Sequence, residues 1–408
     1  PPTKPKAPAT PAIPVPDPAP VPAKPVVIAP DFHHEVRGIL ESTCISCHGA
    51  DSQKGGLRLD TLAYMKKGGD SGPALIPGNK EESILLERIH LPADDEEIMP
   101  PKNGPLSAQD KDILDRWVGT GATWPKGVQL KEISERELVL RNKSKNKQLV
   151  SIAAYPKSIT LKTQEDFNSV VLVATYSDDV TRDVTFESSM WLENSAIADF
   201  RDKILYPKQQ GETKLLAEFE DKRIEVPVVV TEPTVPRPVS FKLDVMPVFM
   251  KAGCNTGSCH GSARGQDRFM LSLFGYNPEG DHSRITREQG TRRINLAIPE
   301  ESMLVEKAIG TVPHSGGKLF GKESRHWKTL VDWLKDGANE DPKDIAKPTN
   351  IELFPPSALL EGEGATQQMT VLAHYSDGTT RDVTPLTVFQ SSNDVSAAVD
   401  EKGLVTAG

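Results

Sequence analysis

The strongest constraint on the fold of this 408-residue chain is a tandem duplication within it. The ten residues Tyr176–Thr185 (YSDDVTRDVT) recur 199 positions later as Tyr375–Thr384 (YSDGTTRDVT). A cysteine motif is also repeated: Cys44–Gly49 (CISCHG) returns, with two extra residues, as Cys254–Gly261 (CNTGSCHG). The repeats follow one another in the order A, B, A′, B′, which predicts two copies of a two-domain unit.

The two kinds of repeat carry different periodicities. In the A units, Ser107 with Asp110 forms a capping-box pattern before an apolar helical stripe that ends at Trp117. Ser324 has the same position before Trp333. These patterns predict a closing helix in each A unit.

The B units alternate apolar and polar residues instead, with Val171 and Val173 on one face of a strand. Short runs of this kind, separated by Asp, Asn and Gly turns, predict a small β-sandwich. We expect the Arg182–Asp183 dipeptide, and its repeat at 381–382, to form solvated cross-strand pairs.

The sequence therefore predicts a multidomain α and β protein in which two mostly α-helical domains alternate with two β-sandwich domains. Residues 1–30 hold 12 of the 34 prolines and are expected to form an extended Pro/Ala-rich linker. The expected helical domains are 31–128 and 238–345, and 129–149 is a second linker. The expected β domains are 150–233 and 349–408, of which the last is incomplete.

Composition excludes several classes of protein. The 48 basic and 57 acidic side chains give a formal charge of −9 without any basic run, which argues against nucleic-acid binding. The aliphatic stretches are far shorter than the ~20 residues needed to span a bilayer, so no transmembrane segment is expected. The chain starts at Pro1 without a signal peptide, and B′ stops before it matches the Glu225–Thr231 segment of B. We therefore expect a mature protein or fragment with further C-terminal domains.

All four cysteines lie in the two repeated motifs. Cys44, Cys47 and His48 have the spacing by which c-type haem is attached. Two thiols close in space form thioethers with the haem vinyl groups, and the adjacent histidine becomes an iron ligand. Gly49 follows directly and is expected to let the backbone pass close to a flat ligand.

The second motif departs from this spacing, because four residues separate Cys254 from Cys259. The thioether positions on haem are fixed, so the extra residues must bulge outward, and Asn255 and Gly257 suit such a bulge. Its alignment with the first motif predicts thioethers at both cysteines and His260 as an iron ligand. Two covalently attached haem c groups are therefore expected.

The sixth iron ligand is predicted from position. Met99, in a proline-rich loop before the closing helix, is the expected ligand in A, and His314 lies at the aligned position in A′. Met303 and Met270 are the alternatives in A′. A thioether ligand raises the reduction potential and a second imidazole lowers it, so the first haem is expected to have the higher potential.

Two other uses of the cysteines remain open. All four together have the ligand set of one Cys₄ zinc site. Each pair could instead form a redox disulfide, and a Cys254–Cys259 disulfide without haem is an alternative for A′ alone. Neither use explains why a histidine follows each pair.

These residues resemble known families. The A units resemble planctomycete-type cytochrome c domains, which share the CxxCH-Gly start, the Met99–Pro101 loop and a terminal helix with Trp117. A′ is similar but has the longer cysteine gap and His314 in place of Met. The B units resemble bacterial Ig-like domains of group 2, marked by the hairpin at 375–384. The resemblance implies cytochrome c-like and Ig-like domains in a large secreted or surface protein.

Together these features predict an extracytoplasmic di-haem c-type cytochrome that transfers electrons, located in the periplasm or at the cell surface. Redox partner proteins of unknown identity are expected, and no catalytic residues are predicted. Two alternatives are a haem enzyme of the di-haem peroxidase type and a surface adhesin with haem-free cytochrome-like modules.

Overall fold

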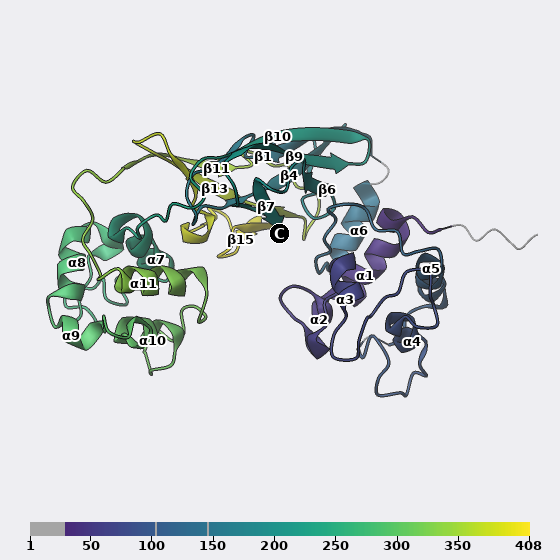
Figure 1. Cartoon of the computed structure of the whole chain (residues 1–408), viewed down its shortest axis with the longest axis horizontal. Coiled ribbons are helices and arrows are strands. Elements are labelled where there is room, and N and C mark those ends of the chain that lie inside the picture. Colours follow the sequence, from purple (N-terminus) through teal and green to yellow (C-terminus); the bar gives the residue numbers. More distant parts are fainter. Residues whose placement is uncertain (1–28, 103, 145–146) are drawn as a thin grey trace, which may run out of the picture.

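The structure is a computed structural model that describes residues 29–102, 104–144 and 147–408 (Figure 1). The predicted linker 1–30 lies outside these residues except for its last two positions. Along the described chain, helices are followed by strands, and the same order is then repeated. We call the four parts the first helical module (α1–α6), the first β module (β1–β10), the second helical module (α7–α11) and the second β module (β11–β16).

The helical modules are built from short helices. Those of the first are α1 (Arg37–Thr43), α2 (Ile45–His48), α3 (Leu62–Lys67), α4 (Ile84–His90), α5 (Ala108–Gly119) and α6 (Glu135–Ser144). Those of the second are α7 (Met246–Lys251), α8 (Pro278–Thr286), α9 (Gly290–Arg293), α10 (Met303–Ile309) and α11 (Arg325–Lys335).

The strands of the first β module are β1 (Leu149–Tyr155), β2 (Ile159–Leu161), β3 (Asn168–Ser169), β4 (Val171–Tyr176), β5 (Thr181–Asp183), β6 (Ser189–Leu192), β7 (Ala198–Arg201), β8 (Ile204–Pro207), β9 (Gly211–Phe219) and β10 (Lys222–Val230). Those of the second are β11 (Pro348–Phe354), β12 (Thr366–Gln368), β13 (Thr370–Tyr375), β14 (Thr380–Asp382), β15 (Ala397–Val399) and β16 (Leu404–Ala407). They form sheets in the orders β1-β4-β5, β2-β10-β9-β6, β3-β8-β7, β11-β13-β14 and β12-β16-β15.

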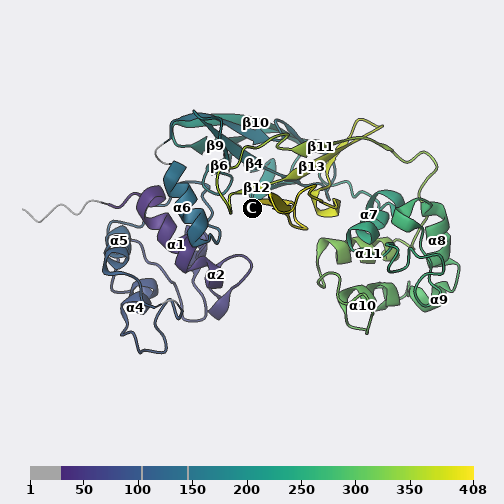
Figure 2. The same ribbon diagram turned by 180° about the vertical axis from the view of Figure 1, so that it is seen from behind.

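Both predicted closing helices are confirmed. Ser107 Oγ accepts from the Asp110 backbone N–H at the start of α5, and Ser324 Oγ accepts from the Trp327 N–H at the start of α11. Each helix carries one fully buried tryptophan into the core of its module, Trp117 in the first and Trp333 in the second. The two helical modules have separate cores. They lie at opposite ends of the central strands (Figures 1 and 2).

The two β modules contact each other through equivalent residues. Asp183 accepts from the backbone N–H of Gln368 at 2.9 Å, and Asp382 accepts from that of Ser169 at 2.7 Å. The two aspartates are 199 positions apart in the sequence, and so are the two residues that donate to them. Such reciprocity is the pattern of a two-fold interface, here formed within one chain.

A stacked aromatic pair repeats this symmetry. The rings of Tyr155 and Phe354, again 199 positions apart, lie 5.6 Å from each other. The expectation that the Arg–Asp dipeptides of the hairpins form solvated cross-strand pairs is therefore wrong, since both aspartates bond to the other β module. The sequence pattern of one repeat does not show which of its side chains the other repeat will cover.

The first helical module is attached to the first β module by buried ion pairs. Arg141 of α6 lies between Glu41 and Glu187, and Arg37 donates to the carbonyl of Phe186. Helix α6 lies within 129–149, the stretch expected to be a linker. Its buried arginine makes this stretch part of the attachment.

The second helical module is attached to the second β module through Asp244, which pairs with Arg237 and Arg381. Burial alone raises the pKa of Asp244, but the two guanidinium groups outweigh it and hold this pKa below its usual value. Within the described ranges, every helix is too short or too polar to cross a bilayer.

Candidate functional site

The first cysteine motif lies where α1 passes into α2. The N–H of His48 donates to the carbonyl of Cys44 at 3.0 Å, and the N–H of Leu59 donates to the carbonyl of His48 at 2.7 Å. Cys44 borders the apolar core, and Met99 packs against the same core. The structure thus brings the first cysteine and the predicted sixth ligand of this module to one apolar cluster.

The second motif keeps this backbone frame despite its two extra residues. The N–H of His260 donates to the carbonyl of Cys254 at 3.0 Å, and the N–H of Leu271 donates to the carbonyl of His260 at 2.7 Å. These distances equal those of the first motif. The longer cysteine gap therefore leaves the relation between the first cysteine and the histidine unchanged.

The predicted form of the extra loop is only partly right. Gly257 is exposed, as an outward bulge requires, but Asn255 is fully buried, and its carbonyl accepts from the N–H of Phe274. The residue with left-handed backbone is Gly253, at φ 72°. The prediction that Asn255 bulges outward is wrong, because the loop turns one residue before the first cysteine.

The glycines that close the two motifs have a local role. A Cβ at Gly49 would lie 2.7 Å from the carbonyl oxygen of Ile45, and one at Gly261 would lie 2.1 Å from that of Asn255. Both positions thus require glycine because the motif packs against its own backbone. This contact does not test the prediction that Gly49 lets the backbone pass close to a flat ligand, which stays a prediction.

The clearest feature of the second helical module is a pair of facing histidines. The ring centres of His260 and His314 lie 6.2 Å apart, and their planes differ by 9°. Metal–nitrogen bonds of about 2.0 Å place the ring centres of two imidazoles on opposite sides of one metal ion ~6.3 Å apart. The observed spacing is therefore the one that two imidazole ligands of one metal ion need.

Backbone carbonyls engage the same nitrogen of both rings. The Nδ1 of His260 is 2.8 Å from the carbonyl oxygen of Phe269, and that of His314 is 3.4 Å from the carbonyl oxygen of Gly317. Hydrogen bonds from Nδ1–H to these carbonyls leave both Nε2 atoms free to bind a metal. Burial lowers the pKa of His260, and the Phe269 carbonyl opposes this only in part, so the ring is neutral.

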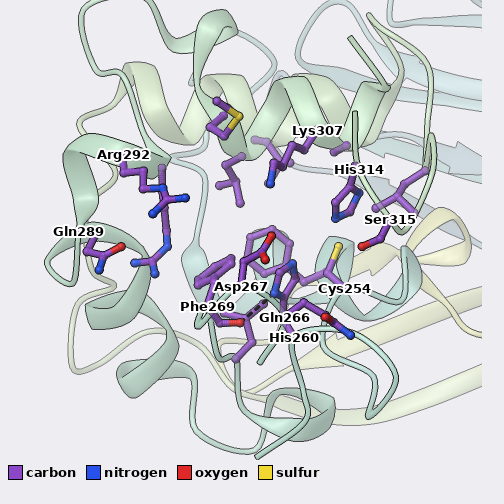
Figure 3. A pocket seen from close by; sticks show the side chains of 18 of the residues that line it. Cys254, His260, Gln266, Asp267, Phe269, Gln289, Arg292, Lys307, His314 and Ser315 are labelled. Atoms are coloured by element: carbon purple, nitrogen blue, oxygen red, sulfur yellow. Dashed lines mark hydrogen bonds between the residues drawn. The ribbon is translucent and has the colours of Figure 1, made fainter. Parts of the chain in front are cut away.

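These histidines line a cavity together with Cys254, Phe269 and Met303 (Figure 3). Its volume is about 110 Å³. More than half of the residues that line it are apolar, and two imidazoles lie among them. This lining suits a mostly apolar cofactor with a central metal.

The candidate residues differ in their relation to this cavity. Cys254, His260, His314 and the alternative ligand Met303 line it, whereas Cys259 and Met270 are not among the lining residues. Met303 is 38% exposed.

In the first module, burial lowers the pKa of His48, and the carbonyls of Leu57 and Lys54 counter the shift only in part. Leu57 corresponds to Phe269, because each lies two residues before the leucine that donates to the carbonyl of the motif histidine. The Nδ1 of His48 is buried without a well-formed hydrogen bond among the described residues. A neutral imidazole of this kind is a suitable metal ligand.

The four cysteines, all of them described, are free thiols. They lie in two separate modules, and the described residues contain no group of three or more His, Cys, Asp or Glu side chains that could hold a metal ion. The interpretation of one shared Cys₄ zinc site is therefore wrong. Burial raises the pKa of Cys44 and raises that of Cys254 to about 12, so both thiols are protonated at neutral pH.

Sequence reasoning missed the basic residues of the cavity. Arg292, Arg293 and Lys307 line it, with Gln289 beside the arginines. The adjacent arginines at 292–293 are the one sequence signal that points to them, but nothing in the sequence places them opposite His314.

Comparison with known proteins shows that the segment with the first cysteine motif is similar to a known family. Residues 44–103 match the family described as planctomycete cytochrome C. This segment contains Cys44, Cys47, His48 and Met99. The first helical module therefore contains a cytochrome c-like segment.

No curated protein matches the chain. Among solved structures, domains 5–6 of the S-layer protein SbsC align with a TM-score of 0.18 at 12% identity, over 21% of this chain and 45% of that one. Domains 4 and 5 of the same protein align with a TM-score of 0.18 at 12% identity, over 26% of this chain and 57% of that one. The alignments thus span about half the length of these structures.

Proposed function

We propose that this chain is an extracytoplasmic di-haem c-type cytochrome that transfers electrons. In this proposal the two helical modules are cytochrome c-like domains, and they alternate with two Ig-like β-sandwich modules that hold them in place. Cys44 and Cys47 attach one haem c, and Cys254 and Cys259 attach the other.

The observation that carries the proposal is the pair of facing imidazoles in the second helical module. His260 and His314 have the separation and parallel planes of two axial ligands, and Cys254 lines the same cavity. When bound, haem supplies an iron that gains and loses one electron. His260 is oriented by the Phe269 carbonyl, so its free Nε2 needs little reorganisation to bind a metal.

For the first helical module, the match of residues 44–103 to planctomycete cytochrome C supports haem attachment. There we propose His48 and Met99 as the axial ligands. Met99 packs against the core that Cys44 borders, and its backbone N–H donates to the carbonyl of Arg88 at 3.1 Å, which anchors the loop on α4.

The proposed location follows from the cofactor chemistry, since bacteria attach haem c covalently outside the cytoplasmic membrane. The periplasm or the cell surface are the two compartments that fit. Electron transfer also requires redox partner proteins, which we propose without naming them. The reciprocal contacts of the β modules, at Asp183 and Asp382, would keep the two haem modules at a constant separation.

The test is the intact mass of the denatured protein after expression together with a haem-attachment system. The expected result is a mass increase of two haems that survives unfolding. Replacing Cys44 and Cys47 by Ala should remove one haem, and replacing Cys254 and Cys259 should remove the other. A protein that folds without covalent haem would overturn the proposal.

A further inference from the structure

The cavity of the second helical module has two chemically different ends (Figure 3). Cys254, His314 and Ser315 lie at one end, and Arg292 and Gln289 lie at the other. The thiol end is the one where a covalent attachment would form. The opposite end is cationic and has no part in that attachment.

Three cations line the cavity: Arg292 at this end, Lys307 between the two ends, and Arg293 (Figure 3). Neither Arg292 nor Lys307 forms an ion pair or a side-chain hydrogen bond within the part of the chain that the structure describes. Asp267 is the one acidic residue among the residues that line the cavity, so the lining carries a surplus of two positive charges, and Glu288, outside the lining, also acts on Arg293. Arg292 is exposed, so solvent can serve it, but a positive surplus in a cavity favours the binding of an anionic ligand there.

Arg293 is held in place by the protein. Its guanidinium lies over the Phe269 ring at 4.3 Å from the centroid, and it donates to the carbonyl of Arg284 at 2.7 Å. Burial lowers its pKa, the charge of Glu288 opposes this shift in part, and the smaller effect of the neighbouring Arg292 adds to it. A carboxylate next to both arginines would relieve this crowding of like charges.

We propose that Arg292, Arg293 and Lys307 bind the two carboxylate groups of the tetrapyrrole in the second helical module. This inference rests on the proposed function. On haem c the two propionates lie on the edge away from the thioethers, and the basic end of the cavity lies away from Cys254 (Figure 3). The charge surplus of two equals the charge of two ionised propionates.

The first helical module does not share this arrangement. The corresponding loop, residues 70–75, contains no basic residue. Lys307 corresponds to Arg88, because both lie five residues after an aligned serine, and Arg88 is paired with Glu97. The anion-binding end is therefore a property of the second copy alone.

The experiment measures the reduction potential of the lower-potential haem in the full di-haem protein, for Arg292→Gln, Lys307→Gln and the double variant. Arg287→Gln is the matched control, since it removes the same charge from an exposed residue of this module that does not line the cavity. Resonance Raman spectra of the propionate bending modes are recorded for the same proteins. Arg293 is left intact because it also supports the backbone.

Each cavity variant should lower the potential, and the double variant more than either single one, because loss of a cation favours the ferric state. The propionate bands should shift in the same variants and stay unchanged in Arg287→Gln. If two haems are attached but the cavity variants behave like the control, the inference is overturned and the proposed function stands. If the mass shows no haem on the second module, the inference and the proposed second haem site fail together.

Discussion

The two halves of the chain share a pattern of hydrogen bonds and differ in the side chains that line the cavity and contact the neighbouring modules. In both halves the motif histidine donates to the first cysteine's carbonyl at the same distance, although the cysteine gap differs. The two closing tryptophans also behave alike: Trp117 Nε1 donates to the carbonyl of Thr123, and Trp333 Nε1 donates to that of Asn339, each six residues on. A buried serine repeats too, since Ser83 and Ser302 each accept from a backbone N–H seven residues earlier.

The differences concentrate on the cavity and on the module contacts. Met99 in the first half is replaced by His314 in the second, and only the second half has the basic end at 292–293. The halves also differ where modules contact each other. Lys203, whose Nζ reaches the carbonyl of Gly127, is 5% exposed, whereas Lys402, 199 positions later, is exposed. After the duplication, the backbone frame was retained while the side chains toward the ligand and the neighbouring modules diverged.

The largest expected difference between the two halves lies in the proposed sixth ligands, and exchanging these ligands tests it. Met99→His should lower the potential of the first haem, and His314→Met should raise that of the second, because axial ligands set haem potentials over a range of ~0.8 V. Potentiometric titration followed by visible absorption measures both. Met303→Leu is the control in the second cavity and should leave the ligation unchanged. A spectrum that responds to Met303→Leu but not to His314→Ala would identify methionine as the ligand instead.

The next largest effect concerns the separate cores. Trp117→Ala and Trp333→Ala should each cost about 3–5 kcal/mol of stability, because a fully buried ring and its hydrogen bond are lost. Calorimetry should show that each variant lowers a different unfolding transition. Trp191→Ala, in which a half-buried ring of β6 is removed, should affect neither of these two transitions. A single transition that both helical variants lower equally would mean that the modules unfold as one unit.

A pH-dependent effect of similar size distinguishes the two aligned lysines, Lys203 and Lys402. Burial lowers the pKa of Lys203 to about 7 from its usual 10.5, and its Nζ donates to the carbonyl of Gly127 at 3.2 Å. Below about pH 7 both the folded and unfolded chains hold this proton, but between about pH 7 and 10.5 unfolding takes one up. The free energy of unfolding should therefore rise with pH across this window, on the order of 5 kcal/mol in total.

Urea unfolding at a series of pH values tests this contribution. Lys203→Met should remove the rise, whereas Lys402→Met, at the aligned exposed position, should retain it. Equal pH profiles for the wild type and Lys203→Met would show that this lysine keeps its ordinary pKa in the folded protein.

The smallest expected effect concerns the two-fold contact of the β modules. Asp183→Ala and Asp382→Ala should each cost about 2 kcal/mol, since each removes a charged acceptor from a backbone N–H of the other β module. Because the contacts are equivalent, the two costs should be similar. Chemical unfolding measures them, with Asp221→Ala, at an exposed hairpin end, as a control that changes stability by less than about 0.5 kcal/mol. A loss in one variant only would show that the interface is not symmetric in energy.

Much of the fold follows from patterns within a few residues. The capping serines Ser107 and Ser324 and the buried stripes ending at Trp117 and Trp333 are all readable from contiguous sequence, and all are confirmed. Such signals are local because a cap bonds to a backbone N–H three residues on, and a helix returns to the same face every turn.

The candidate site was only partly predictable. The cysteine motifs mark where a haem would attach, and the aligned spacing singles out His314. The inward turn of Asn255 had no such signal, and the adjacent arginines at 292–293 gave no sign of where in the cavity they lie. They depend on how the loop packs against residues far along the chain, as with the contact between Asn255 and Phe274.

By itself, the sequence determined the repeat order, the helical and β character of the repeats, the helix starts and the positions of the cysteine motifs, because each is encoded in neighbouring residues or in a repeat at constant offset. Only the tertiary structure decided that His260 and His314 face each other, that Asp183 and Asp382 bond across the β modules, and that Lys203 is buried while its counterpart is exposed. These outcomes depend on burial and on distances between remote segments, which are settled by how the modules pack together.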